Sequence, residues 1–217
     1  AEGWSITPPG FRFDIAIEED LLEEIGRIYG YNNLPSSSLL MRAALGKAPE
    51  GQLAIVRFQD CLVDRGYQEA ITYSFIDENM QNTIAPNDEF IRIQNPISSE
   101  LAVMRTTLWG GLLNAALYNL NRQQTRVRLF EAGLKFTRLN GETQQTKMLA
   151  GLVVGHINSE QWAEKSRNVD FFDVKADVEA LFALTGTTAV FEATQHPSLH
   201  PGQSAKISDS NGKAIGL

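Results

Sequence analysis

The chain has 217 residues, 43% of them hydrophobic, and a formal charge of −7, so it has enough apolar material for a substantial core. This acidic balance excludes a protein that binds nucleic acid mainly by neutralising phosphates, because that mode needs a basic surface. The apolar runs are too short to cross a bilayer, no signal peptide is visible, and the single cysteine, Cys61, excludes an internal disulfide. We therefore expect a cytoplasmic protein with no membrane partner.

The first predicted element is an acidic, amphipathic helix that begins near Ile17. Apolar residues recur at helical spacing at Ile17, Leu21, Ile25 and Ile28. The helix therefore has an apolar face that must pack against another surface. Gly30 is expected to end it, because glycine adopts the left-handed conformation without a Cβ penalty.

Four acidic side chains accompany this helix and are candidate metal ligands. Asp20, Glu23 and Glu24 stand at i, i+3 and i+4 and so share one surface, while Asp14 lies upstream and can fold back. Acids near a helix start suit the macrodipole and usually form a solvated face. Carboxylate oxygens are also the ligands that Mg²⁺ prefers. The residues alone leave both interpretations open.

The stretch after Pro35 is rich in serine and predicts a linker, so we place the boundary between a small leading unit and the main domain near residues 36–48. Pro49 is predicted to open a second helix that ends at Gly66. The alternating residues 70–75 are rich in β-formers and predict a strand.

The remaining elements follow from the same two periodicities. Strands are predicted over 90–94, over 126–136 with a break at Gly133, and over 148–154. Helices are predicted after Arg105, capped by Ser98 or Ser99 and carrying Leu108 and Leu112, and over 173–184. Together they predict an α+β fold with an antiparallel sheet and flanking helices. A strand is predicted to begin at 214–217, and with no initial Met we expect both ends to lie inside a longer polypeptide.

A second group of candidates is the only basic concentration in the chain. It consists of Arg122, Arg126, Arg128, Lys135 and Arg138. These residues keep a strand face soluble, or they face RNA or an acidic subunit surface. Cys61 is expected to be a small buried hydrophobic residue, and the three histidines lack metal-ligand spacing.

Several motifs, in order along nearly the whole chain, resemble the β subunit of bacterial phenylalanyl-tRNA synthetase. They are Arg12-Phe13-Asp14, Glu19-Asp20-Leu21, Glu23-Glu24, Tyr29-Gly30-Tyr31-Asn32, Gly66-Tyr67, Ile71-Thr72-Tyr73-Ser74-Phe75, Asn95-Pro96-Ile97-Ser98 and His200-Pro201-Gly202. The resemblance implies that residues 1–40 are the C-terminal part of a small helical, magnesium-binding domain. It implies that residues 41–217 are a non-catalytic module resembling a class II aminoacyl-tRNA synthetase catalytic domain, truncated at its C-terminus.

The same resemblance implies a cofactor and partners. Asp14, Asp20, Glu23 and Glu24 match the positions of the family's Mg²⁺ ligands. The implied partner is a catalytic α subunit in an α2β2 heterotetramer, which attaches L-phenylalanine to tRNA(Phe) with ATP in the intact enzyme. The chain itself is then a scaffold and subunit interface without an active site. The alternative is a stand-alone acidic protein-binding module unrelated to tRNA charging.

The expected lack of catalysis rests mainly on one position, and the glycine-rich, arginine-bearing third motif of class II enzymes is also not found in these residues. Where the resemblance places the arginine that holds the ATP phosphate, this chain has Thr137, and Arg138 follows one residue later. Because a strand alternates its faces, Arg138 is expected to point away from that site. Loss of this positive charge removes a large electrostatic contribution to adenylyl transfer, so we expect no tight ATP binding by the chain alone.

Overall fold

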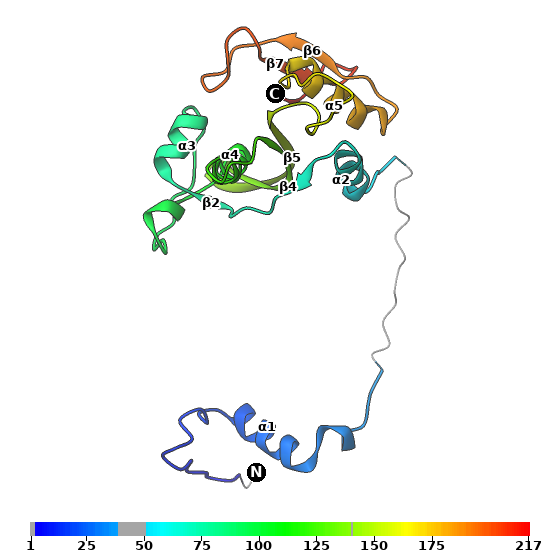
Figure 1. Ribbon diagram of the computed structural model, residues 1–217. Coiled ribbons are helices and arrows are strands. Elements are labelled where there is room, and N and C mark those ends of the chain that lie inside the picture. Colours follow the sequence, from blue (N-terminus) through cyan, green and yellow to red (C-terminus); the bar gives the residue numbers. More distant parts are fainter. Residues whose placement is uncertain (1–2, 39–50, 140) are drawn as a thin grey trace. The chain divides into compact units, whose positions relative to one another are not determined.

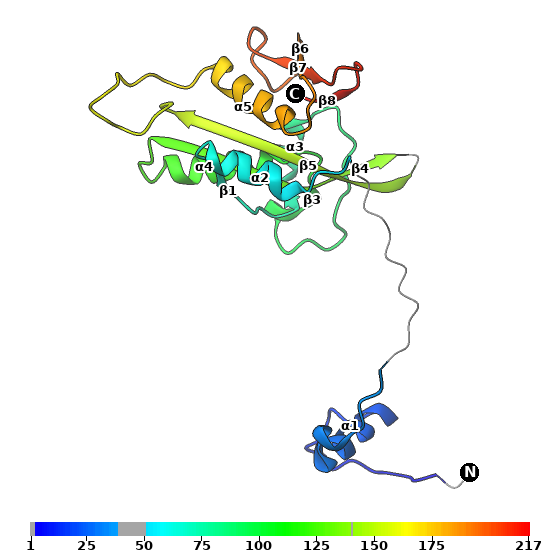
Figure 2. The ribbon, with the colours of Figure 1, turned by 90° about the vertical axis from the view of Figure 1, so that its right-hand side faces the viewer.

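The computed structural model describes residues 3–38, 51–139 and 141–217 and divides the chain into two compact units, Ala1–Pro49 and Glu50–Leu217 (Figures 1 and 2). The domain boundary predicted between residues 40 and 41 lies outside the described residues. No helix in the described part of the chain has the length and apolar character needed to span a bilayer.

The first unit is built around α1, Glu18–Tyr29, which is followed by the short 3-10 turn η1, Tyr31–Asn33. Gly30 ends the helix with a φ of 91°, as the sequence predicts. None of the residues of α1 is buried, and its apolar side chains Leu22, Ile25 and Ile28 are exposed. The apolar face that the sequence predicts is therefore present, but the described part of this unit does not cover it.

The second unit is organised around a long hairpin. Its strands β4, Arg126–Leu139, and β5, Glu142–Gly155, pair antiparallel along all 14 residues of each. The predicted antiparallel pairing is present in this hairpin, but β1, Gln68–Glu69, lies beside β4 in the parallel direction, so the sheet is mixed. The break predicted at Gly133 was wrong, because β4 continues through it.

Helices cover both faces of this sheet. On one face α4, Trp109–Leu120, packs Leu112 and Ala116 against Val127 and Leu129. On the other face Leu62, Tyr67 and Phe130 form a cluster with Leu181. Leu62 comes from α2, Ile55–Asp64, and Leu181 from α5, Phe171–Ala183. Figure 1 shows α4 and α2 on opposite sides of β4 and β5, so the sheet is the middle of three layers.

The other strands of the described chain form two smaller antiparallel sheets. They are β2, Phe75–Ile76, with β3, Val103–Met104, and β6, Val190–Ala193, with β7, Ala205–Ser208, and β8, Ala214–Gly216. α3, Glu78–Ile84, and the 3-10 turn η2, Ser99–Leu101, complete the elements. The α+β class is confirmed, as are the helix near 173–184 and the strand near 214–217.

Three predicted elements differ from the structure. Residues 51–54 are not helical, so α2 starts later than predicted, and Pro49 lies outside the described residues. Within 70–75 only Phe75 joins a strand, because Thr72 bonds to the side chain of Glu131 instead of to a neighbouring backbone. Residues 90–94 form only a single bridge, Arg92 with Val103.

The predicted cap of the helix after Arg105 was also wrong. Ser98 precedes only η2 and makes no side-chain capping bond there. The following helix, α4, begins after Leu108, again without a side-chain cap.

Candidate functional site

Two of the four predicted metal ligands, Asp14 and Glu24, lie against Arg12 in the first unit. One nitrogen of its guanidinium, Nη2, lies 2.7 Å from an oxygen of Asp14 and 2.7 Å from an oxygen of Glu24. The second oxygen of Glu24 accepts from Arg27 at 2.5 Å. Hydrogen bonds from Arg12 lower the pKa of both Asp14 and Glu24, and these bonds raise the pKa of Arg12. Both carboxylates therefore favour the charged form.

Asp20 performs a different local task. One of its carboxylate oxygens accepts from the backbone N–H groups of Ala16 and Ile17, at 2.7 and 2.9 Å. These bonds fix the chain at the entry to α1 and lower the pKa of Asp20. The side chain of Glu23 is exposed, and it forms no hydrogen bond within the described residues.

This arrangement provides oxygen donors of the type that suits Mg²⁺, but it places a guanidinium between two of them. Within residues 3–38, 51–139 and 141–217, no three His, Cys, Asp or Glu side chains are arranged so that they could hold a metal ion. The structure thus brings Asp14 and Glu24 together through Arg12, while Asp20 is held by backbone groups and Glu23 points to solvent. As placed, two of the four carboxylates, Asp14 and Glu24, bind a guanidinium rather than a metal ion.

The second unit contains a buried ion pair that the sequence did not reveal. Arg105 donates to Glu131 at 2.7 Å, and both side chains are almost fully buried. Arg105 also donates to Leu134 O at 2.9 Å, while the Thr72 hydroxyl donates to Glu131 at 2.7 Å. A Cβ at Gly133 would lie 2.5 Å from the Arg105 guanidinium, so the strand needs glycine where the arginine crosses it.

A second buried junction joins α2, β4 and α5. Asp177 accepts from Arg65 at 2.5 Å, from the Tyr67 hydroxyl at 2.6 Å and from Arg128 at 2.7 Å. The Arg128 guanidinium also lies over the Tyr67 ring, 4.5 Å from its centroid. Burial, and then the bond to Asp177, raises the pKa of the Tyr67 hydroxyl, which therefore remains a proton donor.

This junction corrects the prediction for the basic concentration. Arg128 is buried and paired with Asp177, so it serves neither a soluble strand face nor a partner surface. Arg126 donates to Ile157 O, and Arg122 stacks on the ring of Tyr118. At these three positions the basic side chains make contacts within the chain.

Thr137 and Arg138 lie in the regular part of the hairpin. Thr137 pairs with Gln144, and Arg138 pairs with Thr143, without a bulge. Because neighbouring strand residues point to opposite faces, Thr137 shares the face of Glu131, and Arg138 lies on the other face. The side chains of Thr137 and Arg138 therefore lie on opposite faces of β4, as strand alternation predicts.

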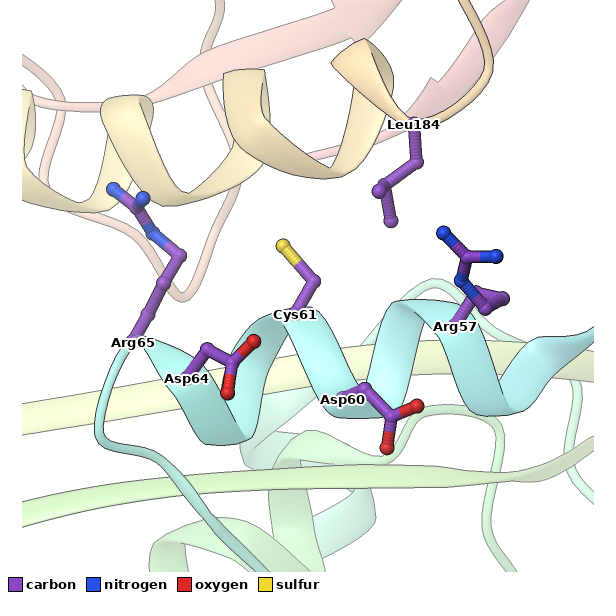
Figure 3. A pocket seen from close by; sticks show the side chains of 6 residues that line it. All are labelled: Arg57, Asp60, Cys61, Asp64, Arg65 and Leu184. Carbon is purple, nitrogen blue, oxygen red and sulfur yellow. The ribbon is translucent and has the colours of Figure 1, made fainter.

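The groove in Figure 3 has a volume of about 370 Å³ and lies between α2 and the end of α5. Arg57, Cys61 and Arg65 project from α2 toward α5, whereas Asp60 points away from it. Cys61 was predicted to be a buried residue, and the structure buries it only in part. With two arginines and two aspartates among its lining residues, the groove has no single sign of charge to select a ligand.

Comparisons with known proteins identify the family. The protein-family model described as "Phenylalanyl tRNA synthetase beta chain CLM domain" matches residues 34–217. The family model described as "tRNA synthetase B5 domain" matches residues 1–31. Both models describe parts of tRNA synthetases. The chain belongs to the family of phenylalanyl-tRNA synthetase β chains, as the sequence motifs predict.

Individual relatives agree with this assignment. The chain is 56% identical over 213 residues, 98% of its length, to a protein named phenylalanine–tRNA ligase beta subunit from Methylococcus capsulatus. It is 48% identical over 216 residues to the protein of the same name from Hahella chejuensis. The chain spans 27% of the length of each of these relatives.

One solved structure that is similar to this chain is a pyrrolysyl tRNA synthetase from Desulfitobacterium hafniense. The two structures superpose with a TM-score of 0.45 and are 12% identical in sequence, and the match covers 73% of this chain and 55% of that one.

Proposed function

We propose that this chain is a non-catalytic scaffold segment of a phenylalanine–tRNA ligase. In the intact enzyme, the β subunit assembles with a catalytic α subunit as an α2β2 heterotetramer in the cytoplasm, and the enzyme uses ATP to attach L-phenylalanine to tRNA(Phe). The observation that carries this proposal is 56% identity to a β subunit along 98% of the chain. A stand-alone acidic binding module does not account for that match.

We further propose that residues 41–217 have the architecture of a class II synthetase catalytic domain without its chemistry. Support comes from the order of elements, in which helix α2, a glycine turn and β1 are followed by the Arg105 segment and the β4–β5 hairpin. The face of β4 that carries Thr137 also carries the buried Arg105–Glu131 pair. Thr137 has no positive charge, and Arg105 is paired with Glu131, so no arginine at these positions is free to bind a phosphate on that face of β4.

For residues 1–40 we propose the C-terminal part of a small helical domain that binds Mg²⁺ through Asp14, Asp20, Glu23 and Glu24. The uncovered apolar face of α1, where Ile25, Ile28 and Tyr29 line a shallow groove, supports an incomplete domain. In this conformation Arg12 neutralises two of the four carboxylates. Binding of the cation therefore requires Arg12 to leave, and packing of the rest of the domain supplies a reason for that change.

The test of the function is assembly. The full-length β subunit, co-expressed with the α subunit of the same organism, is expected to co-purify as a heterotetramer that charges tRNA(Phe) with phenylalanine. The matched comparison is the same β subunit with residues 51–217 deleted, which is expected to lose the α subunit. Recovery of an active complex without residues 51–217 would reject the scaffold role.

A further inference from the structure

Helix α4 has more apolar surface than its packing on the sheet uses. None of its twelve residues carries a charge. Leu112 and Ala116 are buried against Val127 and Leu129. Helices that are apolar on more than one side are typically covered on more than one side. The composition of α4 is therefore that of a helix inside a larger structure.

The second apolar side of α4 is a regular stripe. Leu113, Leu117 and Leu120 follow each other at i, i+4 and i+7 and so line up along the helix. Their exposed fractions are 44%, 56% and 38%. Beside them Tyr118 is also exposed, and the Arg122 guanidinium lies 3.3 Å from the centroid of its ring. Tyr118 and Arg122 thus form a polar edge beside the stripe.

The shape and chemistry of the stripe limit what can cover it. A row at i, i+4 and i+7 is a ridge that fits the groove of another helix. Nucleic acid is disfavoured, because the stripe is apolar and the chain has a net charge of −7. Twelve helical residues span about 18 Å, so four side chains there present far less than the roughly 800 Å² per partner of a stable complex.

A contact of this size is sufficient when the two surfaces are tethered, because tethering gives a high effective concentration. We propose that Leu113, Leu117 and Leu120 form a docking stripe for an amphipathic helix of the same β-subunit polypeptide, outside these 217 residues. This rests on the proposed function, under which the chain is one part of a β subunit, and the chain spans 27% of its relatives' length. The occupant carries its own apolar stripe against these leucines.

Photo-cross-linking in the full-length β subunit identifies the occupant directly. Benzoylphenylalanine replaces Leu117 in one protein and, as the matched control, Asn114 on the same helix in another. The expected product at position 117 is an intrachain cross-link to a β-subunit peptide outside the 217 residues, formed equally with and without the α subunit. A cross-link to the α subunit, a cross-link to a second β copy, or a yield no higher than at position 114 would overturn the proposal.

A stability comparison provides an independent measurement. Leu117→Asp is expected to lower the Tm of the full-length β subunit below that of Asn114→Asp, because the new carboxylate loses its water when the stripe is covered. In the 217-residue chain the two variants are expected to have the same Tm. Equal Tm values in the full-length subunit would contradict the docking stripe. Assembly with the α subunit is measured separately, so failure of the stripe leaves the scaffold role intact.

Discussion

Ser208 at the end of β7 and Ser204 just before this strand have opposite hydrogen-bonding states. Ser208 is buried, and within the described residues its hydroxyl has no hydrogen-bond partner. Four residues earlier, the Ser204 hydroxyl donates to Thr194 O at 2.6 Å. A buried polar group without a partner opposes folding, whereas a satisfied one supports it. The two residues therefore form a matched pair.

We expect Ser208→Ala to stabilise the chain by about 1 kcal/mol, because it removes an unsatisfied buried hydroxyl. Ser204→Ala is expected to destabilise it by about the same amount, because it removes the bond to Thr194. Urea unfolding of the two variants beside the parent chain measures both free energies. Loss of stability in Ser208→Ala would mean that its hydroxyl is satisfied in solution.

Arg12 determines what the acidic cluster can bind. We expect Arg12→Gln to strengthen Mg²⁺ binding by the chain, because Asp14 and Glu24 then lose the guanidinium that neutralises them. Arg27→Gln, which frees only Glu24 and leaves Arg12 bound to both carboxylates, is expected to have a smaller effect. Calorimetric titration with MgCl₂ measures both. An unchanged titration of Arg12→Gln would count against a cation site at these carboxylates.

At the scale of elements, α4 ends in a conformation that glycine suits better than glutamine. Gln123 has a φ of 66°, its N–H donates to Leu120 O, and the Gln124 N–H donates to Asn119 O. These are the bonds of a Schellman motif, in which the left-handed residue is usually glycine. The side chain of Gln123 therefore carries a steric penalty at this position.

Gln123→Gly is expected to raise the free energy of unfolding by up to about 1 kcal/mol, since relief of the left-handed strain exceeds the added entropy of the unfolded chain. Gln123→Ala retains a Cβ and is expected to leave stability near that of the parent. Thermal unfolding followed by circular dichroism compares the three proteins. A glycine variant less stable than the alanine variant would contradict this account.

The start of α5 gives the chain a specific acid sensitivity. Asp173 binds Arg167 through two bonds of 2.7 Å and accepts from the Asp170 N–H, which closes a capping box. The bonds from Arg167, followed by the backbone bond, lower the pKa of Asp173 from its ordinary 3.8 to about 2. Because the folded pKa is the lower one, the stabilisation is present above pH 3.8 and is lost as the pH falls toward 2.

We expect the urea midpoint of the parent chain to fall more between pH 5 and about pH 2.5 than that of Asp173→Asn, which has no carboxyl group to protonate. Arg167→Gln is expected to show the same reduced slope, because the charged partner is missing. Other carboxylates titrate in this range, so the difference between the proteins is the quantity to compare. Parallel pH curves for all three would exclude the contribution of this pair.

At the scale of the whole molecule, local pattern predicted local structure well. The periodicity of α1 and α5 and the glycine at position 30 are all present. Two of the failed predictions depend on distant partners. Arg128 was predicted to lie on the surface, but it is buried against Asp177, which lies 49 residues away in the sequence. Thr72 was predicted to lie in a strand, but its side chain bonds to Glu131, which lies 59 residues away. Such pairings are set by tertiary contacts, which periodicity does not encode.

The candidate metal ligands show the same limit at a site. Helical spacing correctly placed Glu23 and Glu24 on α1, but it gave no sign that Arg12 would lie between Asp14 and Glu24. Arginine and Mg²⁺ compete for the same oxygens, and the choice depends on packing around the cluster. The spacing of acids alone therefore predicts which side chains are near each other better than it predicts what they bind.

The molecule as a whole is expected not to bind ATP tightly. Thr137 replaces the expected arginine, and strand alternation puts Arg138 on the opposite face. Calorimetric titration of the chain with ATP and Mg²⁺ is expected to show no saturable heat at micromolar concentrations, whereas the assembled ligase provides the positive control. Tight binding by the chain alone would show that phosphate recognition does not need that arginine.

The junction at Asp177 has a consequence for how this family varies. One carboxylate serves Arg65, Tyr67 and Arg128, so replacing it alone leaves three donors, two of them charged, without their acceptor. During evolution, Asp177 can therefore be replaced without loss of stability only if several of these positions change in close succession. Across an alignment of β subunits, the four positions are expected to co-vary as one block, and substitutions at any one of them should be rare on branches where the other three are unchanged.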